Sequence, residues 1–322
     1  MSRLKLLAAV PLALALLAAP AHAADLAGKK VFFVNSYHEG YPWSDGEEKG
    51  TKAALAGTGV ELRFFRMDAK RHGDDAFRKA AAEKAKAEIE AYKPDVVIVV
   101  DDPAVKYLLQ AHFKDAKVPF VFAGVNWDAS KYGLPYKNAT GMVEVAPVKA
   151  LMASLRPYAK GDRIGYMTVD SETERIEGPM YEKTIGAPFT VARYTKTFAE
   201  WKEAFKKMQG EVDMVLFGNT AGLPDWNEAE AKAWVMEHTK VPSGCAYDFM
   251  MPFAMLGLTK IEEEQGAWAG ATALRILKGE SPAAIAIAAN KDSKSFINVK
   301  LATKAGVVFK PELVRAATVV TP

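Results

Sequence analysis

The sequence is poor in the side chains that most often hold metals or act as nucleophiles. Its 322 residues include a single cysteine, Cys245, and five histidines. One cysteine excludes an internal disulfide and a cysteine-based metal site. His38, His72, His112 and His238 are too scattered along the chain for metal-ligand spacing. We therefore expect neither a metal nor a cofactor, and we interpret Cys245 as a buried, small apolar residue.

Sequence signatures of several enzyme classes are also missing. The chain has no Gly-x-Ser-x-Gly elbow, no Gly-x-Gly-x-x-Gly after a strand, no P-loop and no His-Glu-x-x-His helix. Ser36 and His38 lie two residues apart on one loop, but no third group completes a nucleophile and its base. We predict no catalytic residues, and an enzyme is the least favoured class of function.

Neither sign of charge is in excess. Residues 1–23 carry two of the 42 basic side chains and none of the 39 acidic ones, so the remaining 299 residues have a net charge of +1. Binding to nucleic acid needs a clear basic excess, because it depends on neutralising phosphates. We therefore expect no nucleic acid among the partners.

Long apolar runs are absent except at the N-terminus. Arg3 and Lys5 precede an apolar run from Leu6 to Ala19, and small residues close the segment at Ala21-His22-Ala23. This pattern predicts a cleavable signal peptide over residues 1–23. A membrane anchor is the alternative, but the run is shorter than the ~20 apolar residues that a span needs. With no cysteine at the cleavage point, we expect a soluble protein in the periplasm.

The rest of the chain alternates short β-branched runs with amphipathic helical stretches such as 74–92 and 198–208. This alternation is typical of βαβ units and parallel sheets, and it occurs in two successive sets. The expected strands are 30–35, 60–67, 95–100 and 118–123, followed by 163–169, 189–194, 212–217 and 242–246. We therefore predict an α/β fold with two Rossmann-like lobes, each a parallel sheet flanked by helices.

The two sets are separated by a break near residues 138–147. Residues 140–144 are expected to form an extended crossover, and Pro147 is suited to the start of the next helix. A later helix, 261–278, is predicted to end at Gly279. We expect the chain to cross between the two lobes several times, so that the crossing segments form a multi-strand hinge and leave a cleft between the lobes. The predicted division is 24–143 plus about 256–288 for lobe 1, and 144–255 plus about 289–322 for lobe 2.

Ligands of open parallel sheets bind beyond the carboxyl ends of the strands. After the first predicted strand, residues 35–46 form a loop rich in hydroxyls, aromatic rings and charge, and Ser36, Tyr37 and Trp43 are candidates there. A helix opening at Ser44 could hold an anion such as a carboxylate. The alternative is that the rings pack over the sheet and Ser44 only caps the helix.

The ends of the other strands add acids, amides and an indole. A carboxylate can pair with an ammonium group, and a ring face adds a cation–π contact of ~0.5–2 kcal/mol. Turn chemistry alone also gathers polar residues at strand ends, so the hypothesis depends on their convergence from both halves. One of Asp101 and Asp102 can be a simple helix cap, and the sequence does not decide which. The further candidates are Asp101, Asp102, Asn126, Trp127, Glu144, Asp170, Asn219, Tyr247 and Asp248.

Several segments carry a family pattern. They are Asn138-Ala139-Thr140-Gly141, Val241-Pro242-Ser243-Gly244, Gly257-Leu258, the stretch from Glu264 to Ala271 and the stretch from Arg275 to Pro282. In these segments the chain resembles the ABC-type substrate-binding protein family that includes tryptophan-type binders, within the type I periplasmic binding protein fold. Two places depart from the transport members. Asn126-Trp127-Asp128-Ala129 replaces an Asp-Pro pair, and the loop 35–45 looks more like that of extracytoplasmic sensor domains.

The resemblance implies a monomeric periplasmic binder that closes on a small molecule and passes it to an ABC permease. The alternative is a ligand-reporting subunit for a membrane sensor protein, a kinase or cyclase. An amino acid or related amine is the first ligand class and a sugar the second. The expected stacking walls are Tyr37, Trp43 and Trp127, the acids Asp102, Glu144 and Asp248, and the hydrogen-bonding groups Ser36, Asn126 and Asn219.

Overall fold

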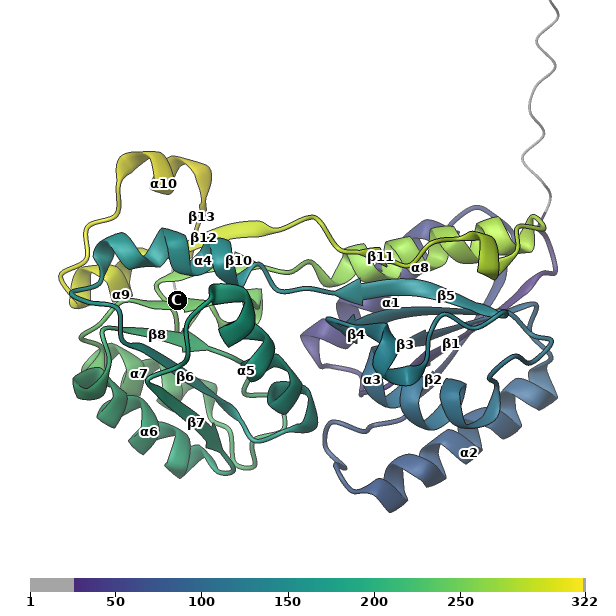
Figure 1. Cartoon of the computed structure of the whole chain (residues 1–322), viewed down its shortest axis with the longest axis horizontal. Coiled ribbons are helices and arrows are strands. Elements are labelled where there is room, and N and C mark those ends of the chain that lie inside the picture. The colour runs from purple at the N-terminus through teal and green to yellow at the C-terminus, as the bar shows by residue number, and fades with distance from the viewer. Residues whose placement is uncertain (1–25, 321–322) are drawn as a thin grey trace, which may run out of the picture.

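The computed structural model describes residues 26–320, so the predicted signal peptide, residues 1–23, lies outside the described residues. Two lobes lie side by side, and several segments of the chain cross from one to the other along one edge (Figure 1). Within residues 26–320, no helix has the length and apolar character needed to cross a membrane.

Lobe 1 contains a six-stranded parallel sheet in the order β11-β5-β4-β3-β1-β2. Alternate side chains of β1 enter different cores: Val31 and Phe33 pack with α8, whereas Phe32 and Val34 pack with α2. This period of two, with helices on both faces, explains why β3 is apolar throughout. The strands are β1 (Lys30–Asn35), β2 (Glu61–Arg66), β3 (Val96–Val100), β4 (Phe120–Asn126), β5 (Ala139–Glu144) and β11 (Ala288–Ala289). The helices are α1 (Pro42–Leu55), α2 (Asp75–Tyr92), α3 (Asp101–Ala104) and α8 (Glu262–Leu277).

Lobe 2 contains a seven-stranded sheet in the order β13-β12-β10-β9-β8-β6-β7. Its pairs are parallel except for β10 with β12. The strands are β6 (Ile164–Val169), β7 (Val191–Thr195), β8 (Met214–Phe217), β9 (Ser243–Cys245), β10 (Leu256–Thr259), β12 (Lys294–Asn298) and β13 (Thr318–Val320). The helices are α4 (Val148–Leu155), α5 (Glu172–Ile185), α6 (Phe198–Glu211), α7 (Glu228–His238), α9 (Val299–Lys304) and α10 (Pro311–Ala316).

The predicted α/β fold of two lobes with helix-flanked sheets is confirmed, and all eight expected strands form within a few residues of their predicted ends. One boundary needs correction. β10 pairs with β9 in the sheet of lobe 2, so the second crossing of the chain follows Thr259, whereas the predicted division has lobe 1 resume at about residue 256. The expected extended crossover is β5, which pairs with β4 before the chain leaves lobe 1.

Helices α1 and α8 pack closely against each other because glycines line their contact. A Cβ atom at Gly266 would lie 1.8 Å from the carbonyl oxygen of Glu47, and one at Gly50 would lie 2.2 Å from that of Glu263. Neither backbone oxygen can move without disturbing its helix. The two glycines therefore determine how near α1, which carries Trp43 and Glu47, approaches α8.

Gly266→Ala is expected to lower the free energy of unfolding by about 2 kcal/mol or more, because the new methyl overlaps backbone atoms of α1. Gly210→Ala is the matched control: a Cβ there meets nothing within 4 Å, and alanine in a helix gains about 0.5–1 kcal/mol. Urea unfolding followed by circular dichroism measures both. Equal effects of the two substitutions would show that close packing of α1 on α8 does not matter.

Candidate functional site

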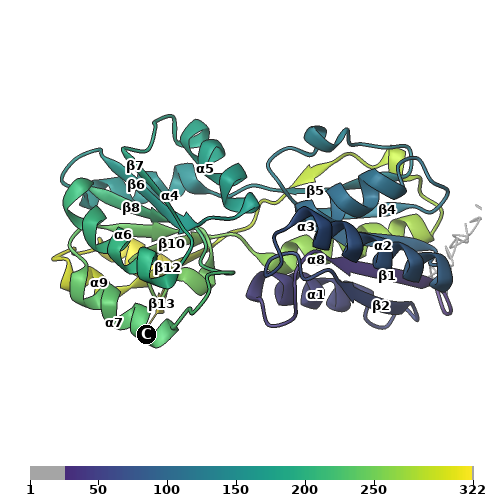
Figure 2. The same ribbon diagram turned by 90° about the horizontal axis from the view of Figure 1, so that it is seen from below.

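An enclosed cavity lies between the lobes at the carboxyl ends of both sheets. It holds about 10 Å³ and is lined from lobe 1 by Tyr37, Tyr41, Trp43, Lys70, Asp101, Asn126 and Glu144, and from lobe 2 by Thr173 and Tyr247. A second hollow of about 20 Å³ shares Tyr37, Lys70 and Thr173 with it. Seen from below, α3 and α5 are on the sides of the lobes that face each other (Figure 2).

Aromatic rings form much of the cavity wall. The ring of Trp43 meets that of Tyr247 edge-on with their centroids 6.0 Å apart, and Tyr37 meets Tyr41 in the same way at 5.6 Å. All four residues are at most 4% exposed. The ammonium group of Lys70 lies 4.8 Å from the centre of the Tyr37 ring. The walls therefore offer apolar surface and π faces to a small ligand.

Asp101 combines an unusual backbone with a free oxygen. It begins α3 with a φ of 67°, in the left-handed region that aspartate tolerates better than most residues. Its Oδ1 accepts a hydrogen bond of 3.0 Å from Nε1 of Trp43, whereas its Oδ2 is buried without a partner among residues 26–320. Burial, followed by the charge of Glu144, raises the pKa of Asp101 well above its usual value.

Asp102 is instead fully engaged within lobe 1. Its carboxylate accepts hydrogen bonds of 2.6 Å from both Asn126 Nδ2 and Tyr132 OH, and pairs with Lys131 at 2.7 Å. It anchors Asn126, whose Oδ1 is buried and has no partner in the described part of the chain. Of the two aspartates that the sequence left undecided, Asp101 is the one with an oxygen available at the cavity.

A buried ion cluster lies at the crossing between the lobes. Lys260 directly follows β10, is 1% exposed, and pairs with Glu144 and, at 3.3 Å, with Glu177. Its ammonium group also lies 4.1 Å from the ring centre of Tyr247. Burial alone lowers the pKa of Lys260, but Glu144 and then Glu177 outweigh it and raise the pKa. Burial raises the pKa of Glu144 to about 7 in spite of Lys260.

Side chains from both lobes meet around the cavity. Tyr37 OH lies 3.1 Å from Thr173 Oγ1, Asn219 Nδ2 donates to Tyr41 OH at 2.7 Å, and Trp127 Nε1 donates to Glu177 Oε2 at 3.1 Å. Farther out, Glu172 of α5 pairs with Arg78 and, at 3.2 Å, with Lys106. Asn219 and Trp127 thus join the lobes, and neither lines the enclosed cavity.

Three predicted site residues lie elsewhere. Ser36 Oγ donates to the Val100 carbonyl at 2.5 Å and accepts from the Ala104 amide at 2.8 Å, so it ties the first loop to α3. Asp170 pairs with Arg175 at 2.8 Å, away from the cavity. Asp248 begins a short 3₁₀ turn and is also outside the lining. The structure brings together Tyr37, Trp43, Asp101, Asn126, Glu144 and Tyr247, with Asp102 at the second hollow.

The sequence reasoning missed several residues that line the cavity or lie beside it. Lys260 follows a strand directly, so the strand-end rule would have found it if β10 had been recognised. Lys70 lies four residues past β2, and Glu177 belongs to the second turn of α5, so neither is next to a strand end. Tyr41 belongs to the same loop as Tyr37 and Trp43 but is not among the predicted site residues, yet it lines the cavity.

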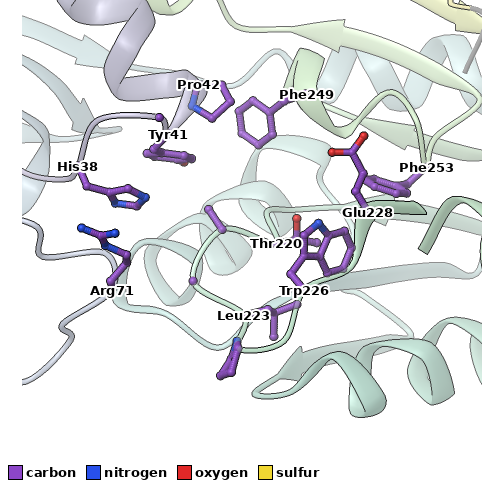
Figure 3. A pocket seen from close by; sticks show the side chains of 14 residues that line it. His38, Tyr41, Pro42, Arg71, Thr220, Leu223, Trp226, Glu228, Phe249 and Phe253 are labelled. Carbon is purple, nitrogen blue, oxygen red and sulfur yellow. The ribbon is translucent and has the colours of Figure 1, made fainter. Parts of the chain in front are cut away.

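A wider pocket opens to solvent on the other side of Tyr41 (Figure 3). It holds about 630 Å³, with aromatic rings from Trp226, Phe249 and Phe253, and with Arg71 and His38 at one side. Tyr41 lines both this outer pocket and the enclosed cavity, and its hydroxyl is bonded to Asn219 of lobe 2. The Tyr41 ring therefore separates the two spaces.

The fold and the interlobe cavity define a two-lobed binding protein of the type I periplasmic class, and known structures agree. The ABC domain from Streptococcus pneumoniae in complex with L-Trp is 20% identical, with a TM-score of 0.68 over 91% of this chain and 99% of that one. A ligand-free, open substrate-binding protein with adhesive properties from Clostridium difficile is 18% identical, with a TM-score of 0.65 over 91% of this chain and 99% of that one. An ABC transporter solute-binding protein from Bacillus halodurans with bound myo-inositol is 14% identical, with a TM-score of 0.57 over 88% of this chain and 99% of that one.

These likenesses establish the fold alone, because the identities are low. A family model for ABC transporter substrate binding proteins matches residues 41–321, and the chain therefore belongs to that family. No curated protein sequence matches the chain. Membership implies a solute-binding role, a small-molecule ligand and an ABC transporter as partner, and it supports an extracytoplasmic location.

Lys260→Met is expected to cost about 3–5 kcal/mol of stability at pH 8, because it leaves Glu144 and Glu177 buried without a cation. A carboxyl group whose pKa is higher in the folded protein than in the unfolded chain favours folding most at pH values below the unfolded pKa. This contribution to the free energy of unfolding is lost as the pH rises. Removing the ammonium raises the pKa of Glu144 further above 7, so the loss is expected to be smaller at pH 5 than at pH 8.

Urea unfolding at pH 5 and pH 8 measures this difference. Lys79→Met is the control, because Lys79 forms an exposed pair with Asp75 that is worth at most about 0.5 kcal/mol. A loss in Lys260→Met that is the same at both pH values would contradict the assigned role of Glu144.

Proposed function

We propose that this protein is a periplasmic solute-binding protein that closes on a small amine-bearing molecule, such as an amino acid, and delivers it to an ABC transporter. The observation that carries the ligand class is the free carboxylate oxygen of Asp101 beside the Trp43 and Tyr247 rings. A buried acceptor without a donor costs about 1–3 kcal/mol, which a ligand ammonium group recovers when it binds.

The surroundings of Asp101 favour a cation over a neutral sugar. Asn126 Oδ1 is a second buried acceptor without a partner, so the cavity offers acceptors and lacks donors to match them. The rings of Trp43 and Tyr247 already attract a cation, since the Lys260 ammonium group lies 5.2 and 4.1 Å from their centres. Sugar hydroxyls would also accept hydrogen bonds, for which the cavity offers Lys70 and the hydroxyls of Tyr37, Tyr41, Thr173 and Tyr247.

The cavity holds only about 10 Å³, close to the room that one water molecule needs, so the lobes must open before a ligand can enter. Lys70 lies at the junction with the second hollow, and no carboxylate of the described residues lies within 4.0 Å of its nitrogen. A ligand carboxylate at that end would give Lys70 an anion, so a zwitterion suits the two ends of the cavity.

Closure is the step that makes binding visible to a membrane partner. Arg78 and Lys106 belong to lobe 1 and Glu172 to lobe 2, so these ion pairs exist only when the lobes meet. A ligand held by Asp101 on one side and facing Tyr247 on the other adds free energy to the same closed state. The membrane partner would then recognise the closed form.

Asp101→Asn is expected to weaken binding of amines and amino acids about 10- to 100-fold, because a hydrogen bond to a charged group is worth about 1.5–3 kcal/mol. The amide keeps the shape and can still accept from Trp43. Thermal shift is measured against a panel of the twenty L-amino acids, primary amines and common sugars. A compound at 100 times its dissociation constant adds about 2.7 kcal/mol, which raises Tm by several degrees.

Asp170→Asn is the matched control, because Asp170 pairs with Arg175 outside the cavity, and it should bind as the natural chain does. Native mass spectrometry of freshly purified protein extends the search to compounds outside the panel. The ligand class is wrong if only sugars bind, and the site is wrong if Asp101→Asn binds as tightly as Asp170→Asn.

Glu172→Arg is expected to weaken binding of the same compounds by at least several-fold, because it faces Arg78 and Lys106 with a like charge and depopulates the closed state. The double variant Glu172→Arg with Arg78→Glu should recover part of the loss. Isothermal titration calorimetry measures the affinities, and Glu203→Arg on the exposed face of α6 is the control. Unchanged affinity in Glu172→Arg would show that these pairs do not contribute to closure.

A further inference from the structure

Glu47 of α1 is buried behind the wall of the cavity. It is 0% exposed, and neither of its carboxyl oxygens has a hydrogen-bond partner among the described residues. A Cβ atom at Gly124 would lie 2.7 Å from Glu47 Oε1 and 2.9 Å from Asp101 Oδ1, so both carboxyls approach the same point of β4. Gly124 has a φ of 66° at a bulge in β4, and the missing side chain leaves room for both groups.

The other buried acids around the cavity have partners of their own. Glu144 and Glu177 share Lys260, Asp102 pairs with Lys131, and Glu174 accepts from the hydroxyls of Tyr166 at 2.6 Å and Thr168 at 2.7 Å. Glu262 of α8 is also buried but lies outside the cavity lining; it faces Asp248, and burial raises its pKa to about 8.

Glu47 and Asp101 are therefore left with little compensation. Trp43 Nε1 donates to Asp101, and the nearby cation is Lys70, which no carboxylate of residues 26–320 approaches within 4.0 Å. Two buried carboxyls side by side resist ionising together, because burial and their mutual repulsion both oppose the second charge. Burial, and then the charge of Asp101, raises the pKa of Glu47 well above its usual value.

We propose that Glu47 and Asp101 share one proton in the unliganded protein, and that the ammonium group of a bound ligand takes the place of that proton. The carboxyl O–H bond breaks, the proton passes to solvent, and the positive charge of the ligand replaces the charge that leaves. Glu47 acts through Asp101 as a positioning residue: the shared proton limits the pair to one negative charge when the cavity is empty, and the second carboxylate that forms on binding favours cations over neutral ligands. The replacement of the proton by a ligand ammonium group rests on the proposed function.

Infrared difference spectroscopy at pH 7 tests the shared proton without any ligand. Subtracting the spectrum of Glu47→Gln from that of the natural chain should show the loss of one protonated carboxyl band. Glu48→Gln is the matched control on the same helix, because Glu48 forms a two-point pair with Arg66, and it should lose ionised carboxylate bands. Glu262 contributes equally to all three spectra. Loss of ionised bands in Glu47→Gln would overturn the inference.

Calorimetry in two buffers of different ionisation enthalpy tests the exchange. Each L-amino acid or primary amine that stabilises the protein in the thermal-shift panel should release about one proton from the natural chain and from Glu48→Gln. It should release none from Glu47→Gln, whose binding also loses its pH dependence below neutral pH. Equal proton release from Glu47→Gln would contradict the exchange. If no panel compound binds, the proposed function fails while the infrared result still decides whether the proton is shared.

Discussion

The cleft is organised around the buried ammonium group of Lys260. Glu144 ends β5 at the first crossing between the lobes, Lys260 follows β10 at the second, and Glu177 belongs to α5 of lobe 2. One cation therefore joins two hinge segments to the helix that faces the other lobe. Without it, two buried carboxylates would lack compensation at the place where the lobes must meet.

This arrangement has an electrostatic consequence for the cavity. Lys260 pairs with Glu144 and Glu177 and forms no ion pair with Asp101, which accepts a hydrogen bond from Trp43. The cavity keeps a surplus of acceptors together with aromatic faces. That surplus of hydrogen-bond acceptors is the physical reason to expect a positively charged group on the ligand. Glu47, which lies behind Asp101, explains how the unpaired acceptors are tolerated when the cavity is empty.

Much of the fold followed from the sequence because apolar, β-branched strands alternate with amphipathic helices. β10 escaped recognition because Leu256-Gly257-Leu258-Thr259 is short and contains a glycine, and its register depends on β9 and β12 from distant parts of the chain. Because β10 was not predicted, the predicted lobe boundary falls at about residue 256, before this strand, and not after Thr259. Strand ends identified Tyr37, Trp43 and Tyr247 as cavity residues, because parallel strands end at the same edge of a sheet.

The positions of the acidic site residues could not be predicted from the sequence. Asp101 and Asp102 are adjacent, and only the left-handed backbone of Asp101 sends one toward Trp43 and the other toward Asn126. Asp170 follows β6 as Asp101 follows β3, yet it turns outward to Arg175. Glu47 lies within a helix, where nothing in its neighbourhood along the chain distinguishes it from Glu48.

A crystal structure of the protein with the compound that remains bound through purification tests the central claim most directly. The account predicts a small molecule between Trp43 and Tyr247, with a charged nitrogen about 3 Å from Oδ2 of Asp101. A bound compound without a cationic nitrogen, or one that lies in the outer pocket beyond Tyr41, would contradict it.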